Sequence, residues 1–439
     1  MNPLAAELNQ LVQAENPHIM EMLASVGQQM FFPKGILSQG AEAKQKAHKL
    51  NATIGIATQA NDIMYFDSVM SSIKDIPARE SLTYAPSFGI PELRKAWKAS
   101  LYAKNSSLKN KSISLPVVTS GITHGVSVFA DLWIDPGDVV ILPEMMWGNY
   151  NMIFSVRKGA RIRTYKTFTS AGGYNIEALR EAVKAEAQQN KKITVLLNFP
   201  HNPSGYTATD TEGDQIVAIL TEAAQSGTQV MAVCDDSYFG LFYETTALQE
   251  SLFARLCGQD PKLLSVKLDG CTKENFVWGL RVGFITYGIA AANPEPVYEA
   301  LEKKTAGCIR GNISNASHLG QSIVLKSMQS EAYPIEKQEK FQILKQRAAT
   351  VKTVLADAKY QEAWEAFPFN SGYFMCIRLK TVDAEKLRVH LLNTYGVGLI
   401  SLGTDKLRIA FSCLEDGDIQ TLFDIILKGV EELQTDNEN

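Results

Sequence analysis

Residues 263–287 read LLSVKLDGCTKENFVWGLRVGFITY, and this stretch decides the fold. Its two ends, 263–268 and 282–287, are short runs rich in apolar and β-branched residues, as expected of strands buried on both faces. The loop between them carries Lys273 and Arg281. Further runs of the same type occur upstream, at 116–119, 139–142, 193–197 and 230–234.

Helical patterns lie between these runs. Residues 126–133 place apolar side chains at the i, i+3, i+4, i+7 spacing of an amphipathic helix. Thr209 and Glu212 form a possible capping box ahead of a second apolar pattern at 216–223. Alternating strands and helices predict a layered α/β domain with a mainly parallel sheet. In such sheets ligands bind at the C-terminal ends of the strands, so the residues that follow each run are the candidates for chemistry.

The pattern changes beyond about residue 322. A long charged helical stretch covers 337–357, and strand-like segments follow at 372–377 and 407–411. A final helix is expected from about residue 416. This order of elements predicts a smaller α+β domain in the C-terminal part of the chain.

The domain organisation follows from these two patterns. We expect a large α/β domain over residues 58–324. Residues 1–57 and 325–439 are expected to form the small domain together, because one isolated N-terminal piece could not bury a core of its own.

Composition narrows the class of protein. The 439 residues carry a formal net charge of −4, with 45% hydrophobic and 21% charged residues, as in ordinary globular proteins. This charge gives no electrostatic reason to expect nucleic acid or an acidic membrane as a partner. The six cysteines show no CxxC spacing, and His201 has no suitably spaced companion, so no metal site is expected. With no evident signal peptide or membrane-spanning run, we expect a cytoplasmic protein.

Polar residues follow the first three predicted strands. Ser120-Gly121-Ile122 opens a helix and can bind an anion, although a plain strand-to-helix turn has the same pattern. Trp147 lies in a loop where it can stack on a flat ligand ring, or equally fill the core. Asn202 lies in a proline-rich turn, either as a ligand-facing amide or as a cap of the turn.

Charged residues follow the next two strands. Asp235 is costly at the end of a buried strand unless a cation pairs with it, either a protonated ring nitrogen or a structural Arg or Lys. Tyr238 adds a phenol three residues later. Lys273 is a nucleophile if its amine is desolvated, and Arg281 can bind phosphate through two hydrogen bonds, but either alone reads as a surface charge. Together these groups suit a flat, phosphorylated pyridine aldehyde.

In the order and spacing of these motifs, residues 54–411 resemble the class I/II aminotransferases, which are enzymes of fold type I that use pyridoxal 5'-phosphate (PLP). The similarity is greatest to the aspartate aminotransferase branch. The resemblance implies a mainly parallel seven-stranded sheet sandwiched by helices, plus a smaller α+β domain. It also implies a homodimer whose active sites are shared across the interface.

The resemblance implies cofactor roles at each strand end. Lys273 is the expected Schiff-base lysine, and with Asp235 and Tyr238 it forms the expected catalytic set. Asp235 is expected to bind the pyridine nitrogen and Arg281 the phosphate. The other expected cofactor contacts are Ser120, Gly121 and Ile122 in the phosphate cradle, Trp147 on the ring, Asn202 and Tyr238 at the ring hydroxyl, Thr272, and Tyr84 from the neighbouring subunit.

Substrate contacts are implied in the same way. The expected residues are Gly55 in a closing loop, Trp147, Asn202, Arg408 for the α-carboxylate, and Arg310 for a distal carboxylate supplied across the dimer. Arg310 is equally compatible with a local acid or backbone partner. The sequence departs from the family pattern at Gly270, where a serine three residues before the lysine usually contributes to phosphate binding.

The expected activity is transfer of an amino group between an L-amino acid and a 2-oxo acid by a ping-pong mechanism. Aspartate or glutamate is the expected donor, with aromatic amino acids as possible additional substrates. A PLP-dependent lyase or decarboxylase on the same site is the main alternative. A non-catalytic regulator that uses this fold to sense a ligand is less favoured, because no helix-turn-helix pattern is evident.

Overall fold

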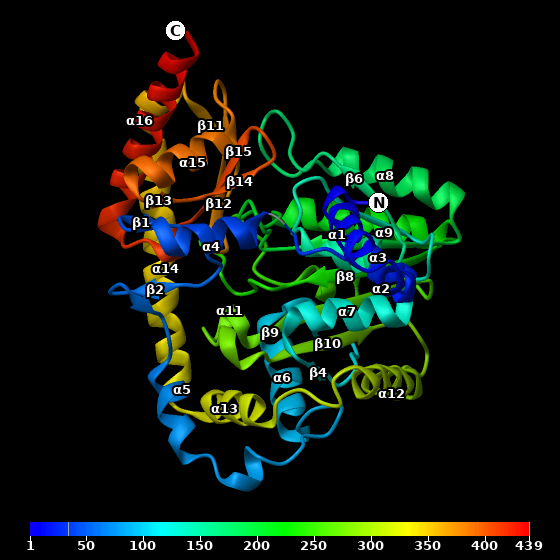
Figure 1. Cartoon of the computed structure of the whole chain (residues 1–439). Helices are drawn as coiled ribbons and strands as arrows, with labels where there is room; N and C mark the ends of the chain where they lie inside the picture. Colours follow the sequence, from blue (N-terminus) through cyan, green and yellow to red (C-terminus); the bar gives the residue numbers. More distant parts are fainter. Residues whose placement is uncertain (34, 439) are drawn as a thin grey trace.

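The computed structural model describes residues 1–33 and 35–438 (Figure 1). Its larger sheet has seven strands in the order β4-β10-β9-β8-β7-β5-β6. Strand β10 runs antiparallel to both neighbours, and the other pairings are parallel. The mainly parallel seven-stranded α/β sheet is therefore confirmed. The strands are β4 (Val117–Thr119), β5 (Val139–Pro143), β6 (Arg161–Tyr165), β7 (Lys192–Asn198), β8 (Gln229–Asp235), β9 (Leu263–Gly270) and β10 (Gly283–Gly288).

Six of these strands match the runs predicted from the sequence, and β6 is the one that the pattern missed. Strand β6 lies at the edge of the sheet and leaves most of its side chains accessible to solvent. Arg161 on this strand forms a two-pronged hydrogen-bonded ion pair with Glu186 on the neighbouring helix. An edge strand of this kind lacks the continuous apolar run by which buried strands are recognised.

Helices cover both faces of the large sheet. Helices α7 (Gly121–Trp133) and α12 (Glu295–Asn312) share one apolar core, and α6 (Pro91–Lys104), α8 (Ile176–Gln189), α9 (Asp210–Gln225) and α10 (Leu252–Leu256) share the other. The predicted capping box is present at the start of α9, where Thr209 Oγ1 accepts from the Glu212 amide and Glu212 Oε2 accepts from the Thr209 amide.

Shorter helices complete this part of the chain. They are α5 (Asp67–Ser72), α11 (Cys271–Glu274) and α13 (His318–Gln329), with a π-helical turn over Asn151–Arg157. The N-terminal helices are α1 (Pro3–Glu15), α2 (Pro17–Met22), α3 (Ser25–Gln29) and α4 (Ile36–Lys46). In Figure 1 the helices α1 to α3 lie in front of the large sheet, while α4 lies beside the small sheet.

The smaller sheet comes from the C-terminal part of the chain, where the sequence predicted an α+β unit, and it is antiparallel. Its order is β11-β12-β15-β14, built from β11 (Trp364–Ala366), β12 (Phe374–Leu379), β14 (Ile400–Leu402) and β15 (Lys406–Ala410). Helices α14 (Tyr333–Leu355), α15 (Ala384–Tyr395) and α16 (Ile419–Glu438) accompany it. The N-terminal strand β1 (Leu50–Asn51) pairs in parallel with β13 (Val397–Gly398), and a small hairpin joins β2 (Thr58–Gln59) to β3 (Asp62–Ile63). The exact limits of the two domains stay a prediction.

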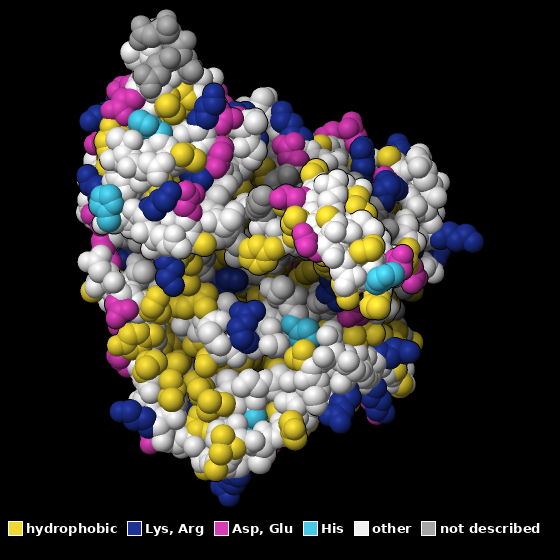
Figure 2. Space-filling model, in the orientation of Figure 1, with side chains coloured by type: hydrophobic (Ala, Val, Ile, Leu, Met, Phe, Trp, Pro, Cys, Tyr) yellow, Lys and Arg dark blue, Asp and Glu magenta, His cyan; other side chains and the backbone are white. Residues whose placement is uncertain are grey.

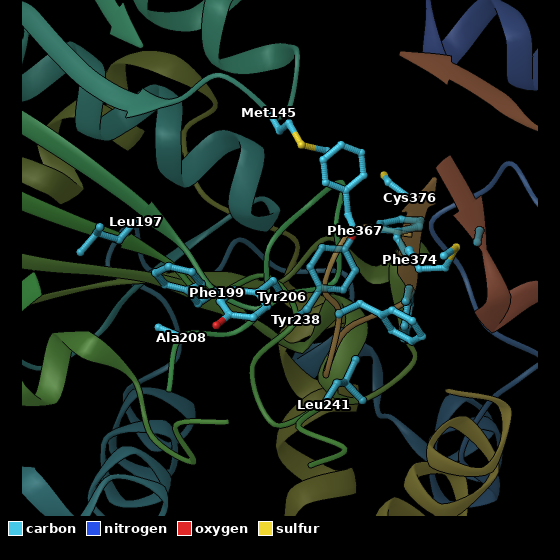
Figure 3. Close-up of a cluster of buried hydrophobic side chains, with 14 of the residues drawn as sticks. Met145, Leu197, Phe199, Tyr206, Ala208, Tyr238, Leu241, Phe367, Phe374 and Cys376 are labelled. Atoms are coloured by element: carbon cyan, nitrogen blue, oxygen red, sulfur yellow. The ribbon is translucent and has the colours of Figure 1, made fainter. Parts of the chain in front are cut away.

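The two sheets share one apolar core. It contains Val195 and Leu197 of β7 together with Ile377 of β12 and Ile409 of β15. Figure 3 shows Phe367, Phe374 and Cys376 on the side of the small sheet and Phe199, Tyr206 and Tyr238 on the side of the large one. Because side chains of both sheets pack together here, residues of the C-terminal part are held close to the ends of the parallel strands.

Gly205 marks the closest approach of the two parts. Its backbone has a φ of +74°, and its carbonyl oxygen accepts from the amides of Asn370 and Ser371, each at 2.9 Å. A Cβ at this position would lie 1.9 Å from the Phe374 carbonyl oxygen. A glycine is needed both for the backbone conformation and for the space.

No helix among the residues that the structure describes is both long enough and apolar enough to cross a membrane.

Gly205→Ala is expected to destabilise the protein by about 1–3 kcal/mol more than Gly137→Ala, as overpacking of a filled interior does. Gly137 is the matched control, because its φ is +89° but a Cβ added there would meet no atom within 4 Å. Chemical denaturation of both variants measures the difference. Equal losses would mean that only the left-handed backbone matters at Gly205.

Candidate active site

A pocket lies at the C-terminal edge of the parallel strands, where the sequence predicted it. Its lining comes from the ends of β5, β7, β8 and β9 and from the start of α7. The lining residues are Ile122, Thr123, Trp147, Tyr150, Asn198, Asn202, Asp235, Ser237, Tyr238, Thr272, Lys273 and Arg281. Eight of these were predicted from the sequence, and the structure brings all eight together.

Lys273 lies on the short helix α11, directly after β9. Its Nζ is 4.8 Å from the centre of the Tyr238 ring. Burial lowers the pKa of Lys273 to about 8; the charge of Asp235 opposes this shift and that of Arg281 adds to it. At pH 7 about one lysine in ten is then neutral, compared with about one in three thousand at the ordinary pKa. The amine is therefore available as a nucleophile and as a base.

Asp235 ends β8 and is only 1% exposed. Tyr150 donates to its Oδ2 at 2.6 Å, and the Ser237 hydroxyl and amide donate to its Oδ1 at 2.5 and 3.1 Å. Asn198 donates to its backbone carbonyl at 2.8 Å. Burial raises the pKa of the Asp235 carboxyl, and the donated hydrogen bonds oppose that shift. The carboxylate is thus held in a fixed direction and suits a cationic partner.

The start of α7 and Arg281 form an end of the pocket that favours anions. A Cβ at Gly121, where φ is +77°, would lie 2.5 Å from an Arg281 guanidinium nitrogen, so the backbone and the guanidinium are in close contact. Thr272 Oγ1 is buried without a hydrogen-bond partner among the described residues. The Ser120 amide donates to His124 Nδ1 at 3.0 Å, which leaves the next amides of the helix as the free donors.

Gly270, the departure from the family pattern, has a steric cause. A Cβ there would lie 2.7 Å from the Val282 carbonyl oxygen and 2.9 Å from Gly283 Cα. The backbone at Gly270 is extended, so the constraint is space and not conformation. Strand β10 passes too close for the usual serine, and Thr272 offers a buried hydroxyl without a partner two residues later.

Arg408, on β15 of the small sheet, lies beside the pocket, where it contacts the lining residue Asn202, and is 2% exposed. Its guanidinium donates to the Thr53 carbonyl oxygen at 2.8 Å and to Asn202 Oδ1 at 3.3 Å, and it lies 4.2 Å from the Phe374 ring centre. No described carboxylate pairs with it, and its Nε has no partner. Burial lowers the pKa of Arg408. A buried guanidinium without a counter-charge is costly, so this side chain suits a carboxylate ligand.

Gly55 lies beside the pocket, in the segment that crosses Tyr238. A Cβ at Gly55 would lie 3.5 Å from the Tyr238 hydroxyl and 3.3 Å from the Phe374 ring. The segment is tied to the C-terminal part, because Ser412 Oγ donates to the Ile56 carbonyl oxygen at 2.6 Å.

Tyr84 and Arg310 lie outside the pocket of their own chain. Tyr84 is 88% exposed, and Arg310 at the end of α12 is exposed and donates to Ser314 Oγ at 2.6 Å. Their segments are neighbours, because Ser87 Oγ donates to the Ser314 carbonyl oxygen at 2.8 Å. One chain alone therefore does not bring these two predicted residues to the site.

Four lining residues were missed by the sequence analysis: Thr123, Tyr150, Asn198 and Ser237. Each lies within four residues of a predicted one, on the same strand end or turn. Their polar character at a strand end was a usable signal. Tyr150 in particular follows Trp147 by three residues, but only the structure shows that its hydroxyl reaches Asp235.

Comparison with known proteins identifies a family. The family model described as aminotransferase class I and II matches residues 47–426. An aspartate aminotransferase from Bacillus sp. (strain YM-2) is 25% identical over 252 residues, which are 57% of this chain and 60% of that protein. The chain thus aligns with about three fifths of the length of this curated relative.

Solved structures share the fold. An aminotransferase from Anaerococcus prevotii superposes with a TM-score of 0.81 at 22% identity, covering 92% of this chain and 98% of that one. A kynurenine aminotransferase from Pyrococcus horikoshii, in complex with PMP, superposes with a TM-score of 0.78 at 15% identity, covering 94% and 98%.

Gly270→Ser is expected to lower the free energy of unfolding by about 1–3 kcal/mol, because the new Cβ meets backbone atoms that cannot move aside. Gly279→Ser, in the same motif, is the matched control, since no atom lies within 4 Å of its Cβ position. Thermal and denaturant unfolding of both variants measure the effect. A Gly270→Ser protein as stable as the Gly279→Ser control would contradict the steric account.

Proposed function

The chain belongs to the class I and II aminotransferase family, and we propose that it is a PLP-dependent aminotransferase in which Lys273 carries the cofactor. One observation carries this proposal. A half-buried lysine amine whose pKa is lowered to about 8 by desolvation shares a pocket with a fixed carboxylate, Asp235, and an anion-binding end formed by α7 and Arg281.

The residues present fit PLP. Asp235 would pair with the protonated pyridine nitrogen, and Trp147 would lie on the ring face. The unpartnered Thr272 hydroxyl, the first free amides of α7 and Arg281 would hold the phosphate. When bound, PLP supplies an electron-accepting ring that stabilises negative charge at the substrate Cα.

The residues of this chain then have distinct roles. Arg408 binds the substrate α-carboxylate, since it is a buried guanidinium with no described carboxylate partner. That contact fixes which bond at the Cα faces the ring. Lys273 Nζ takes the Cα proton as a general base and returns it as a general acid. Asp235 keeps the ring nitrogen protonated, and Tyr150 and Ser237 hold Asp235 in place.

The proposed substrates are a dicarboxylic amino acid, aspartate or glutamate, and a 2-oxo acid. Two observations support this proposal. The segment around Arg310 resembles the segment with which aspartate aminotransferases bind the distal carboxylate of the substrate, and a curated relative is named an aspartate aminotransferase. Arg310 has no carboxylate partner among the described residues, only Ser314.

The proposed assembly is a homodimer with shared sites. Tyr84 and Arg310, two predicted site residues that are exposed on the surface of their own chain, lie on neighbouring surface segments. Exposed apolar side chains accompany them: Ile63, Tyr65, Met70, Ile73, Leu82, Ile313 and Leu319. Figure 2 shows hydrophobic side chains gathered on the lower left of this face, over the region of α5 and α13 in Figure 1. Such a patch favours burial against a second chain.

The activity is tested by adding amino acids to the PLP-loaded protein. Aspartate and glutamate are expected to convert the absorbance of the bound cofactor to that of its pyridoxamine form, with release of the matching oxo acid and reversal by 2-oxoglutarate. Loss of CO2 from aspartate to give alanine, without conversion of the cofactor to its pyridoxamine form, would contradict the proposal and favour the decarboxylase alternative.

Arg310→Ala is expected to lower kcat/KM for aspartate by at least about tenfold, because loss of a charge-assisted contact costs about 1.5–3 kcal/mol, and to leave alanine turnover nearly unchanged. Lys303→Ala is the matched control, an exposed cation on the same helix whose one ion-pair partner among the described residues is Glu299. Unchanged aspartate turnover in the Arg310→Ala protein would refute the dicarboxylate proposal.

Mixing two inactive or impaired variants tests the shared sites. An equal mixture of Lys273→Ala and Arg310→Ala chains is expected to recover aspartate turnover to about a quarter of the wild-type value. Random reassortment makes about half of the dimers mixed, and one of the two sites in each mixed dimer is intact. Lys273→Ala with Arg408→Ala is the control that cannot recover, because both residues belong to the same chain's site. A monomer in sedimentation would contradict the dimer. No recovery of turnover in the first mixture would contradict the sharing of sites between its two chains.

A further inference from the structure

A cluster of three buried charged side chains lies next to the pocket without lining it. Lys267 of β9 is 0% exposed, Asp236 is 3% exposed and Asp269 is 1% exposed. Lys267 forms a hydrogen-bonded ion pair with Asp236, and its Nζ is 3.6 Å from Asp269 Oδ2. None of the three is among the residues that line the pocket.

Neutral donors complete the cluster. Ser251 donates to Asp236 Oδ2 at 2.6 Å, and Trp97 Nε1 lies 3.2 Å from both oxygens of Asp269. The Lys267 ammonium group lies 4.4 Å from the centre of the Phe239 ring. Burial disfavours the charge on Lys267, but Asp236 and Asp269 outweigh burial and hold the pKa of Lys267 above its usual value. The two carboxylates therefore favour the charged form of Lys267, whereas burial raises the pKa of Asp269 to about 6.

The cluster lies on the other face of the sheet from the cofactor pocket. Successive residues of a strand point to opposite faces. Met231 and Val233, which alternate with Asp235, belong to the core shared with α7, while Ala232 and Cys234 belong to the core on the other side. Asp236 follows Asp235 and so joins the second face.

The cluster is connected to both key residues of the pocket. Asp236 directly follows Asp235 at the end of β8, and Lys267 and Asp269 lie on β9, which leads through Gly270 into the helix that carries Lys273. Burial raises the pKa of Asp235, and the charge of Asp236 raises it further. The Asp235 charge in turn raises the pKa of Lys273 against the effect of burial. The pKa of Asp235 thus depends on the charge of Asp236, and the field of the cluster also extends directly to Lys273 on the helix that follows β9.

A buried ion pair is weak evidence for added stability, because apolar side chains of similar size often serve as well or better. Charged residues at this place consequently call for a role other than packing. We propose that Lys267 is a positioning residue that ties the ends of β8 and β9 together and sets the negative charge felt by Asp235 and Lys273. This inference rests on the proposed function, in which those two residues hold PLP.

The test uses three proteins that differ in the charge of the cluster. Lys267→Met removes the cation, wild type has one cation and two carboxylates, and Asp236→Asn removes one carboxylate. More negative charge stabilises a protonated nitrogen at Lys273. In the absorbance titration of the PLP-loaded protein, the midpoint pH is therefore expected to be highest for Lys267→Met, intermediate for wild type and lowest for Asp236→Asn, with steps of about half a pH unit.

A second readout needs no cofactor. In the ligand-free protein, the pH at which acetic anhydride half-maximally acetylates Lys273, read by mass spectrometry, is expected to follow the same order. The paired variant Lys192→Met/Asp138→Asn is the control, because it removes an ion pair at the opposite end of the strands and is expected to shift neither midpoint.

Coincident midpoints for wild type and Asp236→Asn, in either readout, would overturn the proposal and leave the cluster with a purely structural role. That comparison stands even if Lys267→Met does not fold. Failure of the wild-type protein to bind PLP would instead contradict the proposed function, and the acetylation order would still decide the role of Lys267.

Discussion

The desolvation of the Lys273 amine, in a pocket that it shares with the Asp235 carboxylate and the Arg281 guanidinium, is the constraint on which the rest of the site depends. Burial lowers its pKa, Asp235 limits the shift, and Arg281 adds to it. An amine poised in this way has a useful neutral fraction near pH 7, which an exposed lysine lacks. The balance exists only because parallel strands end at the same edge of the sheet and so bring these side chains together.

Close backbone approaches make that arrangement possible. At Gly121 and Gly270 an added Cβ would meet Arg281 or β10, and at Gly205 it would meet β12 of the small sheet. The first two lie at the anion-binding end. The third holds the C-terminal part near the strand ends, where Arg408 contacts Asn202 of the pocket. The same sites explain why Thr272, and not a residue at position 270, offers the free hydroxyl.

Much of this could be predicted from the sequence. Buried parallel strands have a continuous apolar pattern, and eight of the expected residues at their ends line one pocket. Strand β6 was missed because an edge strand lacks that pattern. The contact of Tyr150 with Asp235 depends on the path of a loop, and the space at Gly270 on the approach of β10, neither of which a linear pattern encodes. The proposed roles of Tyr84 and Arg310 would require a second chain.

The central claim is that Lys273 is the residue that carries the cofactor. Other lysines lie near it: Lys267 behind the sheet and Lys104 paired with Glu274. Loading the protein with PLP, reducing it with sodium borohydride and mapping its peptides by mass spectrometry distinguishes them. The account predicts one pyridoxyl group per chain, on Lys273. A group on another lysine, or no stable labelling, would contradict it.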